Sequence, residues 1–193
     1  LIDGLNSIVI GYFLSIATIL IVLNNEYNFI LEINYLKTII LILTVIYLFN
    51  LFGKMYLGDS GAYLISFIFG AFLIKLYNQN PSISPYFIMC LLWYPAFENL
   101  FSIVRKSLNK ISFQKADNKH LHQYLYKFFL KKFKLKKEII NSFTGNVIVL
   151  YNLIYFYLIK DFYFYTQGLI ISVFFNILIY VLLYFWLSKK IKI

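Results

Sequence analysis

The segment Gly58–Gly61 reads Gly-Asp-Ser-Gly and stands where a long apolar stretch begins. Its Asp59 would offer a hard carboxylate oxygen, a ligand that Mg²⁺ takes in ones or twos together with phosphate oxygens. The flanking glycines would allow close approach to the backbone, and the free amides of a following helix could face a phosphate. A capped turn is the alternative. We favour a magnesium site at Asp59, because a carboxylate between two glycines marks the edge of an apolar stretch.

The two histidines of the chain lie together in a second polar segment, Asp117–His122. His120 and His122 are two positions apart and do not share a helix face, so the helical zinc pattern with ligands at i and i+4 is absent. With Lys119 beside them, they suit an anionic diphosphate better than a metal ion. A solvated surface loop is the alternative.

Two further polar groups give weaker signals. The segment Asp3–Asn6 precedes the first apolar stretch, and Asp and Asn commonly cap helices there, so this segment alone indicates a cap. Glu98 lies inside the fourth apolar stretch, where an ionisable side chain is a functional hypothesis by default. It is also close enough to the end of that stretch to reach the interface, with Arg105 as its expected partner.

The composition excludes an ordinary soluble globule. The 193 residues are 61% hydrophobic and only 13% charged, whereas soluble domains are near half apolar and a quarter charged. The single cysteine excludes a disulfide framework. The chain begins at Leu1 with no signal-peptide pattern, and we expect it to be the C-terminal part of a longer protein.

Six apolar stretches are long enough, or nearly so, to cross a bilayer as helices, which takes roughly 17–25 residues. The third is the shortest and is expected to begin near Gly58. No alternating barrel pattern is present, so helices must satisfy the backbone in lipid. The sequence therefore predicts an all-α integral membrane protein of about six transmembrane helices, with a single membrane domain over 1–193. The stretches are Leu5–Leu23, Leu36–Phe52, Ala62–Tyr77, Tyr86–Val104, Phe143–Ile159 and Thr166–Leu187.

Positive residues gather on one side of this topology. Eleven of the 18 Lys and Arg lie between Arg105 and Lys137, three lie in the tail 188–193, and Lys54 joins them. Such a block indicates a positive-inside loop beside anionic lipid, so we expect membrane lipids and no nucleic acid as partners. That side would be cytoplasmic, and all three polar loops would lie there as active-site loops. The other side holds three lysines: Lys37, Lys75 and Lys160.

Residues 105–142 are predicted to form a basic cytoplasmic loop that contains an amphipathic helix. Its apolar positions follow one helical face, with lysines largely outside the stripe, which suits a helix lying in the headgroup region. An ordinary juxtamembrane basic segment is the alternative. The stripe consists of Leu121, Tyr124, Leu125, Phe128 and Phe129.

The order of these motifs resembles the polyprenyl-phosphate N-acetylhexosamine-1-phosphate transferases, glycosyltransferase family four. Four segments carry the resemblance, and the glycine-aspartate motif is the strongest: Leu1–Asn6, Leu57–Tyr63, Pro95–Glu98 and Asp117–His122. The resemblance implies transfer of a sugar-1-phosphate from a UDP-sugar, expected to be a UDP-N-acetylhexosamine, to undecaprenyl phosphate, with release of UMP. This would be the first membrane step of cell-envelope polysaccharide synthesis, at the inner membrane of a bacterium, and it allows a homodimer.

The resemblance also implies roles for individual residues. Asp59 would bind Mg²⁺ and act in catalysis with His120 and His122, while Lys119 would contact the substrate. Tyr56 would stack on uracil, and the nucleotide pocket would be lined by Asp3, Gly4, Leu5 and Asn6.

Some features depart from the family pattern, and two other interpretations stay open. The paired aspartates of the family would lie upstream of residue 1, and Gln123 stands where a further His is common. We therefore expect this chain alone to be inactive, and an inactive family member is one alternative. A transporter or channel subunit is the other, although it predicts charges spread through several spans and repeated broken helices.

Overall fold

The computed structural model describes residues 5–30, 32–110, 112 and 119–192. The described residues form eight α-helices and one short 3₁₀ turn. They are α1 (Ile8–Tyr27), α2 (Ile33–Leu51), α3 (Gly58–Gln79), α4 (Pro85–Leu91), α5 (Trp93–Leu108), α6 (Leu121–Lys132), α7 (Lys137–Ile159), η1 (Lys160–Phe162) and α8 (Thr166–Lys192).

Five of the described helices are long and apolar enough to cross a membrane, namely α1, α2, α3, α7 continued by η1, and α8. The pair α4–α5 makes a sixth span if the two are counted together. Their outer surfaces carry large apolar side chains, such as Leu41, Phe67 and Phe174, which are each about 70% exposed. Apolar surface of this extent suits contact with lipid tails. The chain is a multi-pass membrane protein, as the sequence predicted.

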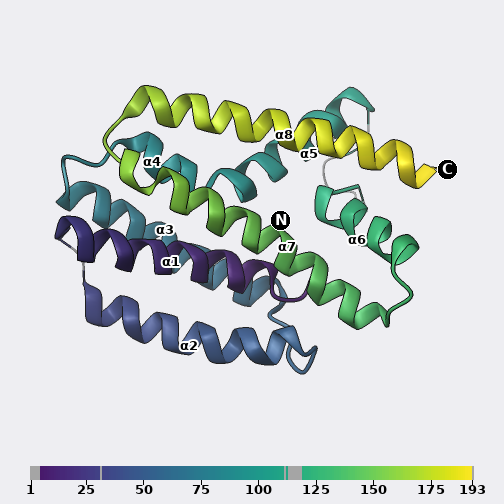
Figure 1. The fold of residues 1–193 in the computed structure, drawn as a ribbon, viewed down its shortest axis with the longest axis horizontal. Helices are drawn as coiled ribbons and strands as arrows, with labels where there is room; N and C mark the ends of the chain where they lie inside the picture. Colours follow the sequence, from purple (N-terminus) through teal and green to yellow (C-terminus); the bar gives the residue numbers. More distant parts are fainter. Residues whose placement is uncertain (1–4, 31, 111, 113–118, 193) are drawn as a thin grey trace.

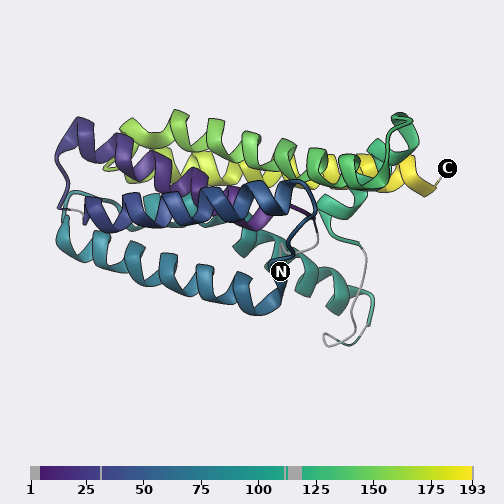
Figure 2. The ribbon, with the colours of Figure 1, turned by 90° about the horizontal axis from the view of Figure 1, so that it is seen from below.

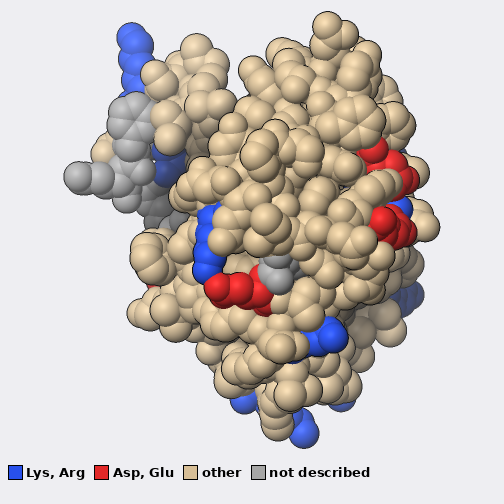
Figure 3. Space-filling model, turned by 90° about the vertical axis from the view of Figure 1, so that its left-hand side faces the viewer, with Lys and Arg blue, Asp and Glu red and all other residues tan. Residues whose placement is uncertain are grey.

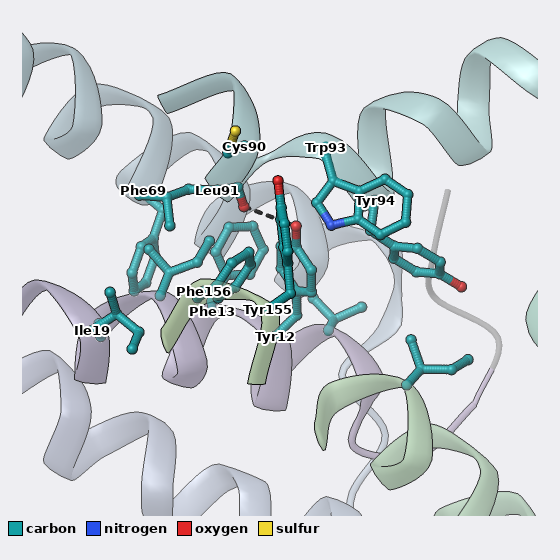
Figure 4. Close-up of a cluster of buried hydrophobic side chains, with 14 of the residues drawn as sticks. Tyr12, Phe13, Ile19, Phe69, Cys90, Leu91, Trp93, Tyr94, Tyr155 and Phe156 are labelled. Carbon is teal, nitrogen blue, oxygen red and sulfur yellow. Dashed lines mark hydrogen bonds between the residues drawn. The ribbon is translucent and has the colours of Figure 1, made fainter. Parts of the chain in front are cut away.

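Helix α1 lies at the centre of the bundle and packs against α2, α3 and α7 (Figures 1 and 2). Gly11 lets α7 approach closely, because a Cβ there would lie only 2.8 Å from Val149. Aromatic rings fill the interior beside α1 (Figure 4). The ring centroids of Tyr12 and Phe156 are 5.6 Å apart, and those of Phe13 and Phe69 are 4.8 Å apart.

The fourth predicted span, Tyr86–Val104, is not one straight helix. It breaks at Leu92 into α4 and α5, which meet at an angle of 74°. Pro95 explains the break, because it has no N–H to donate to the carbonyl four residues earlier, which belongs to Leu91. The hydroxyl of Tyr12 donates to that carbonyl instead, at 2.8 Å (Figure 4). The sequence prediction of a single continuous span is therefore corrected.

The two ends of the bundle differ in charge. One end, here named the basic end, comprises residues 52–58, 105–110, 119–137 and 188–191, where α1, α3, α6 and α7 begin and α2, α5 and α8 end (Figure 1). It carries most of the lysines. The opposite end is seen in Figure 3, where charged side chains are sparse among neutral ones. There Lys160 forms ion pairs with Glu26 (2.6 Å) and Asp161 (2.7 Å).

Helix α6 covers the segment predicted to be amphipathic, and the apolar stripe of that segment contacts neighbouring helices. Tyr124 packs against Tyr184 of α8, with ring centroids 5.2 Å apart. Phe129 packs at the same distance against Phe143 of α7. The stripe therefore faces α7 and α8.

Candidate functional site

A cavity of about 330 Å³ follows α3 from Asp59, next to the basic end, to Gly70. It opens between α1, α3 and α5, and its polar lining residues besides Asp59 are Tyr63 and Ser66 of α3 and Asn99 of α5. Asp59 lies in the first turn of α3, where the helix dipole favours an anion. The turn into this helix requires glycine at position 58, because its φ is +67°. The remaining lining residues are Val9, Phe13, Ala62, Gly70, Leu92, Pro95 and Ala96.

The segment before α1 is held firmly at the same end. The N–H of Asn6 donates to the side chain of Asn141 (2.6 Å), and the N–H of Ser7 donates to the side chain of Asn50. Gly145 of α7 lies directly against this segment, since a Cβ there would come within 2.3 Å of the Asn6 carbonyl oxygen. Leu5 is buried, and Asp3 and Gly4 lie outside the described residues.

Two residues of the proposed substrate pocket lie on the surface. Tyr56 is 79% exposed in the connection before α3 and does not line the cavity that the described residues form. Lys119 is also exposed and directly precedes α6. Asp117 and Asn118 lie outside the described residues.

Glu98 is the centre of a buried polar cluster on another face of α5. Its side chain is 1% exposed, and one carboxylate oxygen accepts hydrogen bonds from Nδ1 of His120 (2.9 Å) and the N–H of Leu121 (3.2 Å). The other oxygen accepts from the hydroxyl of Tyr180 in α8, at 2.8 Å. Arg105, the partner expected from the sequence, donates to Ser102 (3.2 Å). Glu98 thereby joins α5 to the start of α6 and to α8.

His122 lies beneath His120 and away from the surface. It is 1% exposed, its ring stacks on that of His120 with centroids 5.4 Å apart, and its Nδ1 has no hydrogen-bond partner among the described residues. The pKa of His122 is lowered to about 4, chiefly by burial; the Glu98 carboxylate acts in the opposite direction, and the neighbouring His120 makes a smaller contribution to the lowering. His122 is therefore neutral at neutral pH. His120 lies nearer the surface, with 15% of its side chain exposed.

Helix α5 thus carries polar side chains on two faces. Glu98 and Asn99 are adjacent, and adjacent helical residues point about 100° apart. Glu98 accordingly binds His120, while Asn99 lines the cavity with Asp59. The sequence singled out Glu98, Asp59 and His120, but it gave no sign of Tyr180, which is 82 positions from Glu98.

The donor set at the cavity suits a metal ion that shares its coordination with a substrate. Among the described residues there is no cluster of three or more His, Cys, Asp or Glu that could hold a metal alone. Asp59 of α3 and Asn99 of α5 instead both line the cavity, one with a carboxylate and one with an amide. Mg²⁺ is commonly bound by one or two carboxylates, with phosphate oxygens and water completing the octahedron, so this set fits Mg²⁺ bound together with a phosphate group.

Comparison with models of known protein families, with characterised proteins and with solved structures found no match to this chain. The resemblance to the phosphosugar transferases rests on the four sequence motifs alone.

Proposed function

We propose that this protein transfers a sugar-1-phosphate from a UDP-sugar to undecaprenyl phosphate at the cytoplasmic face of a bacterial plasma membrane. The observation that carries the proposal is the meeting of motif segments at the basic end of the bundle. Asp59 shares a cavity with the Pro95–Asn99 segment, and Glu98 of the same segment binds His120. Two groups therefore form on different faces of α5, one joining position 98 to position 120 and one joining position 59 to position 99, and an enzyme site would explain why α5 links these distant segments.

The charge of the basic end supports this orientation. Lysines flank α6, α7 and the end of α8, and cytoplasmic loops carry an excess of positive residues. The same lysines would attract anionic lipid headgroups. A lipid phosphate and a nucleotide sugar would therefore both reach the site from this side.

The proposed reaction is an in-line phosphoryl transfer. An oxygen of the lipid phosphate forms a bond to the β-phosphorus of the UDP-sugar, the bond from that phosphorus to the bridging oxygen breaks, and UMP leaves with the bridging oxygen. Bound Mg²⁺ would neutralise diphosphate charge, and Asp59 with Asn99 would hold it. His120 would contact the diphosphate, and its position beside a buried carboxylate keeps its ring in a fixed orientation.

The test is a transfer assay in membranes from cells that produce the protein. Radiolabelled UDP-N-acetylglucosamine or UDP-N-acetylgalactosamine is mixed with undecaprenyl phosphate, and label is measured in the organic extract over a magnesium titration. We expect label in the lipid only with magnesium, and its loss when excess UMP reverses the reaction. Label that never enters lipid with either sugar would overturn the proposal.

The substitution Asp59→Asn tests the site itself. It keeps the size of the side chain but removes its charge, and we expect a rate at least about a hundredfold lower, since loss of ~1.4 kcal/mol of transition-state stabilisation gives each factor of ten. Asp161→Asn is the matched control, because Asp161 is also exposed but lies at the opposite end of the bundle. An unaltered rate in Asp59→Asn would return this residue to the role of a helix cap.

Transport is the second candidate function, because discontinuous helices such as α4–α5 form the binding sites of many secondary transporters. The two functions differ in their product. A transporter would move a solute across proteoliposome membranes without forming a labelled lipid, whereas the transferase forms the lipid without a gradient.

A further inference from the structure

The carboxylate of Glu98 contacts three separate groups, and the residue is only 1% exposed. An ionised carboxylate is a hydrogen-bond acceptor only, so each of its neighbours must donate. Tyr180 donates through its hydroxyl, and Leu121 donates through its backbone N–H. The contact of 2.9 Å with Nδ1 of His120 therefore requires a proton on that nitrogen.

The position of that proton decides which nitrogen of His120 carries the lone pair that can accept a proton or a hydrogen bond. A neutral imidazole carries one N–H, so a proton on Nδ1 makes Nε2 an acceptor. In water the other tautomer of histidine is the more common one. The carboxylate thus selects one tautomer and one ring orientation, as carboxylates do for histidines in hydrolase triads and metal sites.

The backbone at His120 is held as well as its ring. Leu121 is the first residue of α6, and its N–H is among the four that no carbonyl of the helix can satisfy. Glu98 accepts from this group across the gap between α5 and α6, and its negative charge is favourable at a helix N-terminus. The N–H of His120 itself donates to the Gln123 side chain, at 3.2 Å.

We propose that Glu98 is a positioning residue that holds His120 in the Nδ1–H tautomer, so that Nε2 is the nitrogen that acts on the diphosphate. Tyr180 supports this arrangement by fixing the second carboxylate oxygen from α8. The ligand named here rests on the function proposed above, whereas the tautomer does not.

The tautomer is measured directly by nitrogen NMR of protein labelled with ¹⁵N-histidine. The chain has only two histidines, so the variant His122→Gln assigns both signals. In the unaltered protein at pH 8 we expect His120 to be predominantly the Nδ1–H form. In Glu98→Gln we expect this preference to be lost. A predominant Nε2–H form in the unaltered protein, or an identical tautomer in Glu98→Gln, would overturn the assignment.

Kinetics then test whether the tautomer matters. We expect Glu98→Gln to lower kcat by about ten- to a hundredfold, the usual effect of removing the hydrogen-bond partner of a working histidine, with KM for the UDP-sugar within about twofold. Tyr180→Phe keeps the carboxylate and gives a smaller loss in kcat. Tyr180→Phe also tests the positioning role of Glu98 if the Glu98→Gln variant does not fold.

Tyr155→Phe is the matched control, because it also removes one hydroxyl hydrogen bond between membrane helices, to Ser172 at 3.0 Å, without touching Glu98. Its kcat should equal that of the unaltered protein, and a loss as large as that of Tyr180→Phe would overturn the positioning role. The NMR measurement needs no substrate. A protein that transfers no sugar phosphate would therefore refute the proposed function and leave the tautomer as a separate result.

Discussion

Mild acidification should destabilise this protein through a single buried histidine. His122 has a pKa of about 4 in the fold, whereas an unfolded histidine has a pKa near 6.5. The folded pKa is the lower one, so the unfolded chain binds a proton more readily as the pH falls. The contribution of neutral His122 to the free energy of unfolding is therefore fully present above pH 6.5 and is lost progressively down to pH 4.

The size of the effect follows from these two values. Between pH 7 and pH 5 the unfolded state gains proton binding worth about 2 kcal/mol, while the folded state gains almost none. For a chain of this length, such a loss lowers the melting temperature by about 4–8 °C. Histidines are the only side chains with ordinary pKa values between 5 and 7, so few other groups contribute in this window.

Thermal melts of the detergent-purified protein at pH 7 and pH 5 provide the assay. The variant His122→Gln removes the titrating group, and its melting temperature should fall by less than about 2 °C over the same range. A fall in His122→Gln as large as in the unaltered protein, or no fall in the latter, would refute the reasoning.

Two predictions concern the packing and the topology. Gly145→Ala should destabilise the protein by about 1–3 kcal/mol, because its Cβ would meet the Asn6 carbonyl, whereas Gly70→Ala, with open space around it, should be neutral or stabilising by up to about 1 kcal/mol. Equal melting temperatures for the two variants would contradict the close contact. A cysteine at Lys134 should react with an impermeant thiol reagent only from the cytoplasm, and one at Ser82 only from outside. Labelling of both from one side would contradict the multi-span topology.

The long apolar stretches were sufficient to predict the spans, because a helix in lipid must satisfy its own backbone and so follows hydropathy closely. The start of α3 near Gly58 was also predicted, because the third apolar stretch was the shortest of the six. The positive φ of Gly58 is seen only in the structure. The break at Leu92 was not predicted, although Pro95 was visible. Proline removes a donor, but only the fold shows that Tyr12 replaces it.

Only part of the candidate site could be predicted from the sequence. Residue type and local spacing identified Asp59, His120 and Glu98 as chemically significant. Their grouping depends on the rotation of α5, which places Glu98 and Asn99 on different faces. The contribution of Tyr180 could not be predicted, because one tyrosine among 18 in an apolar chain carries no local signal.

The hydrogen bond from Tyr12 to the Leu91 carbonyl makes the break between α4 and α5 depend on a helix that is synthesised earlier, α1. Its two partners are 79 positions apart, so at usual translation rates α1 emerges roughly 4–16 seconds before the kink does. An unsatisfied carbonyl in lipid costs several kcal/mol. Because α1 is made first, Tyr12 is already in the membrane when α4 and α5 insert, and it can donate to the Leu91 carbonyl at once. In a circular permutant that translates α1 after α5, Tyr12 would be absent when α4 and α5 insert. The Leu91 carbonyl would then enter the membrane without a hydrogen-bond donor.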